Sequence, residues 1–161
     1  LFSARLAAQK GLPFAFASHF APEALLDALQ VYRDNFQPSE QLQQPYAMLA
    51  IPAVPADSMD EAKRLTTTSY QRILALFRGQ PLWMKPPVDS MDGLWNTAEE
   101  AGVKDFLGLQ VLGNSADITQ QLDALLSDIE VDELMFTVDI YEPEKRRHAL
   151  NILAESLSND G

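Results

Sequence analysis

The chain has 161 residues, of which 47% are hydrophobic, which is enough for one globular domain with a substantial core. Its 23 acidic and 12 basic residues give a formal net charge of −11, which would repel a phosphate backbone and makes nucleic acid an unfavourable partner. Cysteine is absent, so disulfides and thiolate chemistry are excluded.

The first part of the chain predicts a helix, a strand and a second helix. Small residues recur at helical spacing over 3–10, and Gly11 supplies the left-handed conformation that commonly ends a helix. The run 13–18 is apolar on both faces, which is typical of a buried parallel strand. Pro22 suits a first helical position, and apolar residues then repeat at helical spacing as far as Phe36.

The middle of the chain predicts another strand and helix, followed by an irregular excursion. The stretch 46–54 is the next apolar strand, and Ser58 opens a capping box for a helix that extends to about Phe77. Several prolines and a glycine make regular structure improbable over 78–94. This excursion is either a mobile lid or a long loop packed on the surface, and a short helix is expected at 97–106.

The last part predicts two helices around one strand. Asn114 or Ser115 can cap a helix whose apolar stripe reaches Ile129. The segment 132–141 reads as a strand with one apolar and one mixed face, and 144–157 reads as a helix. Three long strands separated by helices predict right-handed crossovers, and therefore a single α/β domain built on a parallel sheet.

Three stretches of this sequence closely resemble the carboxy-terminal half of the bacterial luciferase-like monooxygenases. They are LFSARLAAQKGLPFAFASHFAPEAL, LQVLGNSADITQQL and VDELMFTVDIYEPEKRRHALNILAE. The resemblance implies that residues 1–161 form the later strand–helix units of a (β/α)8 TIM barrel. On that basis the fold is an incomplete parallel sheet flanked by helices.

The same resemblance implies the function of the complete protein. Members of the family use reduced flavin, usually FMN, to oxidise a small organic substrate with O2, and a deazaflavin is the alternative cofactor. A flavin reductase and a homo-oligomer are the implied partners, and the fragment alone is expected to be inactive. The alternative is a non-catalytic flavin-binding or interaction protein made from a truncated barrel.

The first site implied by the resemblance lies at the amino-terminal end of the chain. In the family a Gly-Ser-Ser turn, which is missing here, precedes the positions of Phe2 and Ser3 and helps to hold the flavin phosphate. Free N–H groups at the start of the first helix would favour an anion, so Ser3 is the expected phosphate contact. The alternative interpretation of Ser3 is an ordinary helix-capping serine.

The second implied site is the pocket at the end of the first strand, formed by Ser18, His19 and Phe20. In a barrel of this type, binding groups gather at the carboxyl ends of the strands. The period of two places Ala15, Ala17 and His19 on one face, whose small side chains leave room for a planar ring. His19 is either a hydrogen-bond donor to that ring or to substrate, or a structural histidine that ends a core strand.

Other signals are absent from the sequence. His19 and His148 have no partners at metal-ligand spacing on a shared face, so no metal site is predicted. There is no dinucleotide fingerprint, phosphate-loop lysine motif or G-x-S-x-G elbow. No leader is recognised, and no apolar run approaches the roughly 20 residues that span a bilayer, so we expect a cytoplasmic protein without a membrane partner.

Overall fold

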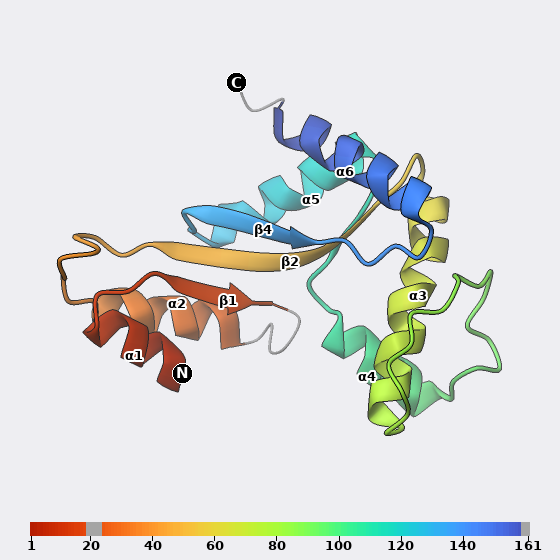
Figure 1. Cartoon of the computed structure of the whole chain (residues 1–161), viewed down its shortest axis with the longest axis horizontal. Helices are drawn as coiled ribbons and strands as arrows, with labels where there is room; N and C mark the ends of the chain where they lie inside the picture. The colour runs from red at the N-terminus through yellow and green to blue at the C-terminus, as the bar shows by residue number, and fades with distance from the viewer. Residues whose placement is uncertain (19–23, 159–161) are drawn as a thin grey trace.

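The computed structural model describes residues 1–18 and 24–158, which form a parallel sheet flanked by helices (Figure 1). The elements in chain order are α1 (Phe2–Gln9), β1 (Phe14–Ala17), α2 (Leu25–Asp34), β2 (Ala47–Pro55), α3 (Met59–Phe77), α4 (Thr97–Phe106), β3 (Val111–Gly113), α5 (Ser115–Asp128), β4 (Glu133–Thr137) and α6 (Pro143–Ser158).

The predicted fold class is confirmed, with two corrections to the strands. The structure adds the short strand β3, which the sequence pattern did not predict, and β4 ends at Thr137 rather than at residue 141. All the pairings are parallel, and within the described residues the sheet does not close into a barrel.

Strand β2 is the centre of the sheet because it pairs with each of the other three strands. Residues 47–50 of β2 pair with β1, residues 48–52 pair with β4, and residues 53–55 pair with β3. On the edge of β2 that pairs with β1, the carbonyl of Ala50 accepts from the N–H of Ser18. The N–H of Ala56 donates to the carbonyl of Gly113 in β3. Alternate residues of a strand direct their backbone groups to opposite edges, so β3 lies on the same edge as β1, just beyond its end.

Two prolines in β2 account for where its neighbours stop pairing. The backbone N–H of Ser18 donates to the carbonyl of Ala50 at 3.0 Å, which leaves the next ladder position at Pro52. Proline has no N–H, so Pro52 cannot donate to the carbonyl of Ser18, and β3 takes over this edge. Pro55 faces the other edge and offers no donor to the segment that follows β4.

The two faces of the sheet have different surroundings. Alternate residues of β2, Ala47, Leu49 and Ile51, are fully buried among the helices in the main core. The intervening residues Met48 and Ala50 are only partly buried by the described part of the chain, and they share the opposite face with Ala15 of β1 and Met135 of β4. Met135 is 48% exposed, so the face opposite the helices is open over part of the sheet. We call this the uncovered face.

The excursion between α3 and α4 is fastened along α3 by side-chain hydrogen bonds. Thr67 Oγ1 accepts from the N–H of Val88 at 2.9 Å, and Thr68 Oγ1 donates to the carbonyl of Lys85 at 2.9 Å. Met91 is buried against both helices, whereas Trp83 is largely exposed. The excursion therefore packs on the outer side of α3, beyond the carboxyl ends of the strands (Figure 1).

Helix α6 is linked to the loop after β2 by a histidine–carboxylate pair. His148 Nε2 lies 2.6 Å from Asp57 Oδ1, and both side chains are more than half exposed. The hydrogen bond to Asp57 and its charge raise the pKa of His148 above its usual 6.5, and Glu61 and Glu155 add smaller effects in the same direction. The pair therefore favours protonated His148 in the folded state.

We expect the contribution of His148 to stability to depend on pH in a defined direction. Because the folded pKa is raised, the contribution is fully present below pH 6.5 and is lost as the pH rises through the folded pKa. Chemical denaturation of the protein and of His148→Gln should show a larger stability difference at acidic pH than at alkaline pH. In an Asp57→Asn background the difference should become nearly independent of pH; a difference that grows with rising pH would contradict the assignment.

Candidate active site

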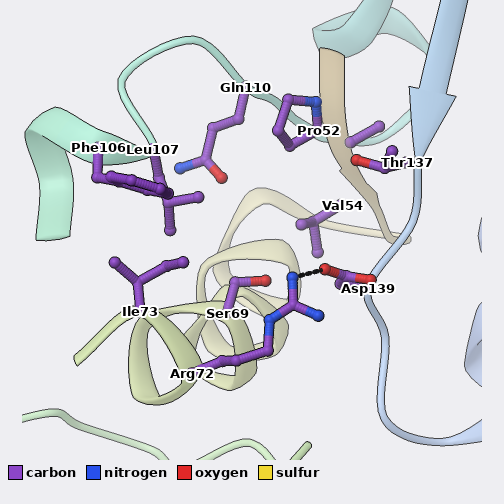
Figure 2. A pocket seen from close by; sticks show the side chains of 11 residues that line it. Pro52, Val54, Ser69, Arg72, Ile73, Phe106, Leu107, Gln110, Thr137 and Asp139 are labelled. Carbon is purple, nitrogen blue, oxygen red and sulfur yellow. Dashed lines mark hydrogen bonds and ion pairs between the residues drawn. The ribbon is translucent and has the colours of Figure 1, made fainter. Parts of the chain in front are cut away.

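A pocket of about 240 Å³ lies at the carboxyl ends of β2 and β4 (Figure 2). Its walls come from the end of β2, the middle of α3, the end of α4 and the segments before β3 and after β4. Five polar side chains belong to its lining: Ser69, Arg72, Gln110, Thr137 and Asp139. Four large apolar side chains complete most of the rest: Val54, Ile73, Phe106 and Leu107.

Helix α3 supplies three of the lining residues because of its register. Ser69, Arg72 and Ile73 are spaced i, i+3 and i+4, so they share one face of the helix. The register begins at Ser58, whose Oγ accepts from the N–H of Glu61 at 3.2 Å and caps the helix. Ser58 therefore caps the helix as predicted, but Glu61 does not complete the capping box, because its carboxylate pairs with Lys145.

Strand β4 brings Thr137 to the pocket, and the segment after it brings Asp139. Leu134 and Phe136 pack into the core beneath the sheet, so the alternate residues Met135 and Thr137 point to the uncovered face. Thr137 therefore reaches the pocket from the uncovered face.

Arg72 and Asp139 form an ion pair at the floor of the pocket (Figure 2). The Nη2 of Arg72 donates to Oδ2 of Asp139, and each side chain is about one third exposed, at 35% and 34%. Since the pair is partly solvated, its contribution to stability is modest, and its main effect is to fix the direction of the guanidinium.

The predicted residue Ser18 lies next to the pocket without lining it. Its side chain is fully buried, and its Oγ donates to the carbonyl of Leu109 at a long 3.5 Å. Leu109 directly precedes Gln110, so Ser18 connects the end of β1 to the segment that carries a lining residue. The other two predicted pocket residues, His19 and Phe20, lie outside the described residues.

The predicted phosphate residues lie at the start of α1 and do not line the pocket. Phe2 is 80% exposed and Ser3 is also exposed. Leu1 occupies the N-cap position and makes no side-chain cap hydrogen bond, and the first turn of α1 carries no acidic residue.

Sequence reasoning missed Arg72, Gln110 and the pairing of Arg72 with Asp139. Arg72 carried one usable signal in the sequence, because it directly precedes the apolar residues Ile73 and Leu74 of a predicted helix. Gln110 carried none, because it precedes a strand of only three residues. Within residues 1–18 and 24–158, no group of three or more His, Asp or Glu residues could hold a metal ion.

A helix-flanked parallel sheet with its pocket at the carboxyl ends of the strands is the arrangement of ligand-binding α/β proteins. The chain is 41% identical over 152 residues to a luciferase-like monooxygenase of Escherichia coli strain K12, a match that covers 94% of this chain and 45% of that protein. No protein-family model matches the chain. The resemblance to the luciferase-like monooxygenases is thereby confirmed, and the chain spans about half the length of the curated relatives it matches.

Solved structures show the same fold. The structure of apo-MsnO8 superposes with a TM-score of 0.78 at 22% identity, covering 96% of this chain and 47% of that one. The oxygenating constituent of 3,6-diketocamphane monooxygenase from Pseudomonas putida, a type II Baeyer-Villiger monooxygenase solved with FMN, gives a TM-score of 0.63 at 17% identity and covers 98% and 45% of the two chains. Among the described residues, no helix is long and apolar enough to cross a membrane.

Proposed function

We propose that this chain is the carboxy-terminal part of a flavin-dependent luciferase-like monooxygenase that oxidises a small organic molecule with O2. The observation that carries the proposal is the pocket at the carboxyl ends of β2 and β4, which opens beside the uncovered face of the sheet. Catalytic sites of parallel α/β barrels lie at this end of the strands. The relatives that are named monooxygenases support the reaction class.

The residues present are compatible with reduced FMN, the cofactor we propose. Ser3 and the uncapped N–H groups at the start of α1 would hold the phosphate. Ala15, Ala17 and Ala50 lie on the uncovered face, where their small side chains leave room for a planar ring. When bound, reduced flavin supplies the electrons that activate O2, and the protein's part is to orient the ring and exclude water from it.

The remaining parts of the proposal concern the surroundings of the complete protein. A separate reductase supplies the reduced flavin, the protein acts as a homo-oligomer, and the compartment is the cytoplasm. A deazaflavin remains the alternative cofactor, and His19 at the mouth remains a prediction. A spectral titration of the complete protein with FMN and with a deazaflavin distinguishes the two cofactors.

Replacing Ser3 with Ala in the complete protein should weaken FMN binding. The loss should be about 1–2 kcal/mol, the contribution of one hydrogen bond to a charged group, or roughly 5- to 30-fold in Kd. Fluorescence titration with FMN measures it, and circular dichroism checks the fold. Ser127→Ala, at an exposed serine of α5, is the matched control and should leave the Kd unchanged. Equal Kd values for Ser3→Ala and the control would argue against this phosphate site.

A further inference from the structure

The polar part of the pocket has unused hydrogen-bonding capacity. Within the described residues, the side chains of Ser69, Gln110 and Thr137 have no hydrogen-bond partner. The amide of Gln110 points into the space between the helices and the strands (Figure 2). Ser69 is 8% exposed, so its hydroxyl would gain most from a ligand that enters this space.

The unused groups favour a ligand that accepts hydrogen bonds. A guanidinium has five N–H donors, and Asp139 engages only Nη2 of Arg72. The two hydroxyls and the Gln110 amide can both donate and accept, and Asp139, the only carboxylate of the lining, already accepts from Arg72. The N–H groups of Arg72 that Asp139 does not engage can only donate, so they favour a planar acceptor group that matches the fork of the guanidinium.

The apolar part of the pocket limits the rest of the ligand. Val54, Ile73 and Leu107 are all buried and add aliphatic surface to the lining. Ile73 and Leu107 lie on the side of Phe106, and Val54 lies close to Asp139 (Figure 2). The cavity of about 240 Å³ is smaller than the roughly 300–1,000 Å³ of typical ligand pockets, so the body of the ligand is short.

We infer that this pocket binds small amphiphilic molecules with a planar, acceptor-rich head, a carboxylate or a carboxamide, and a short apolar body. Arg72 donates to the head, Gln110 and Ser69 complete its hydrogen bonds, and Asp139 acts as a positioning residue that holds the guanidinium in place. The inference rests on the proposed function, for which it names the substrate class.

The test compares three ligands of similar size on the flavin-free protein by ligand-observed saturation-transfer NMR. Isocaproate and isocaproamide should bind, and isohexylamine, which carries a cationic donor in place of the acceptor head, should not. The ratio of the first two affinities shows whether the head is an anion or a neutral amide. Binding of all three with equal affinity, or of none, would overturn the inference.

Variants then assign the binding to this pocket. Arg72→Gln should weaken both acceptor ligands at least tenfold, and Gln110→Leu should weaken them by a smaller factor without removing a charge. Arg64→Gln is the matched control, because Arg64 pairs with Asp89 at 2.7 Å on the exposed side of α3 and lies outside the lining. Equal affinities for Arg72→Gln and Arg64→Gln would also overturn the inference. These titrations contain no flavin or O2. The protein can therefore bind FMN without binding the acceptor ligands, or bind the acceptor ligands without binding FMN, and the two proposals are tested separately.

Discussion

The 161-residue chain, produced by itself, should be found in solution as a dimer or a larger species and should show no FMN-dependent consumption of O2. Light scattering should give at least twice the 17.9 kDa of one chain. The physical reason is the open sheet: within the described residues β1 and β4 each pair only with β2, so each leaves one edge without a partner.

The exposed surface supports the same expectation. The chain has 9316 Å² of accessible surface, whereas a compact monomer of this mass has about 8,000 Å². Part of the excess is the uncovered face, where Met48, Ala50 and Met135 are partly exposed apolar residues. Association covers such a face at little cost in polar desolvation.

A pair of matched substitutions identifies the associating surface. Met135→Glu places a charge on the uncovered face and should shift the chain towards monomer. Leu150→Glu places the same charge on the outer side of α6, at a residue with similar exposure, 50% against 48%, and should leave the mass unchanged. A dilute monomer with full FMN-dependent activity would contradict both the association and the half-barrel interpretation.

Gly113→Ala should lower the free energy of unfolding far more than Gly79→Ala. Gly113 has a φ of +109°, and a Cβ built on it would lie 2.4 Å from Oδ2 and 2.7 Å from Cβ of Asp117. Asp117 belongs to the capping box of α5, in which its N–H donates to Oδ1 of Asn114 at 3.0 Å. Backbone strain and the damaged cap together should lower the free energy of unfolding by about 3–4 kcal/mol.

Gly79→Ala is the control that measures the cost of backbone strain without a steric clash. Gly79 also has a positive φ, of +62°, but an added Cβ would meet nothing within 4 Å, so about 1 kcal/mol is expected. Urea denaturation measures both losses. Asp117→Ala should cost less in the Gly113→Ala background than in the parent, because the cap is already broken there. Equal losses at Gly113 and Gly79 would show that the contact with Asp117 is unimportant.

Local patterns were enough to predict most of the elements. Ser58 does cap α3, and Asn114 does cap α5, because a capping residue and the N–H groups it satisfies lie within three residues of each other. The apolar run that contains Phe14 and the run that contains Leu49 do form parallel strands, but only one face of each is buried along its length: Ala15 is exposed and Met48 is partly exposed. Signals of this kind depend on neighbours in the chain, which a sequence displays directly.

The pairing edges and the pocket were decided by tertiary structure. Strand β3 has only three residues and forms because Pro52 ends the ladder with β1 and frees that edge of β2. Arg72 and Asp139 are 67 residues apart, and their pairing depends on the register of α3 together with the point where β4 leaves the sheet. The residues around Arg72 do not indicate a pairing with Asp139, and those around Asp139 do not indicate one with Arg72. The sequence by itself therefore determined the helices, most of the strands and the family resemblance, whereas the side chains that share the pocket were decided only when the sheet brought distant segments to one edge.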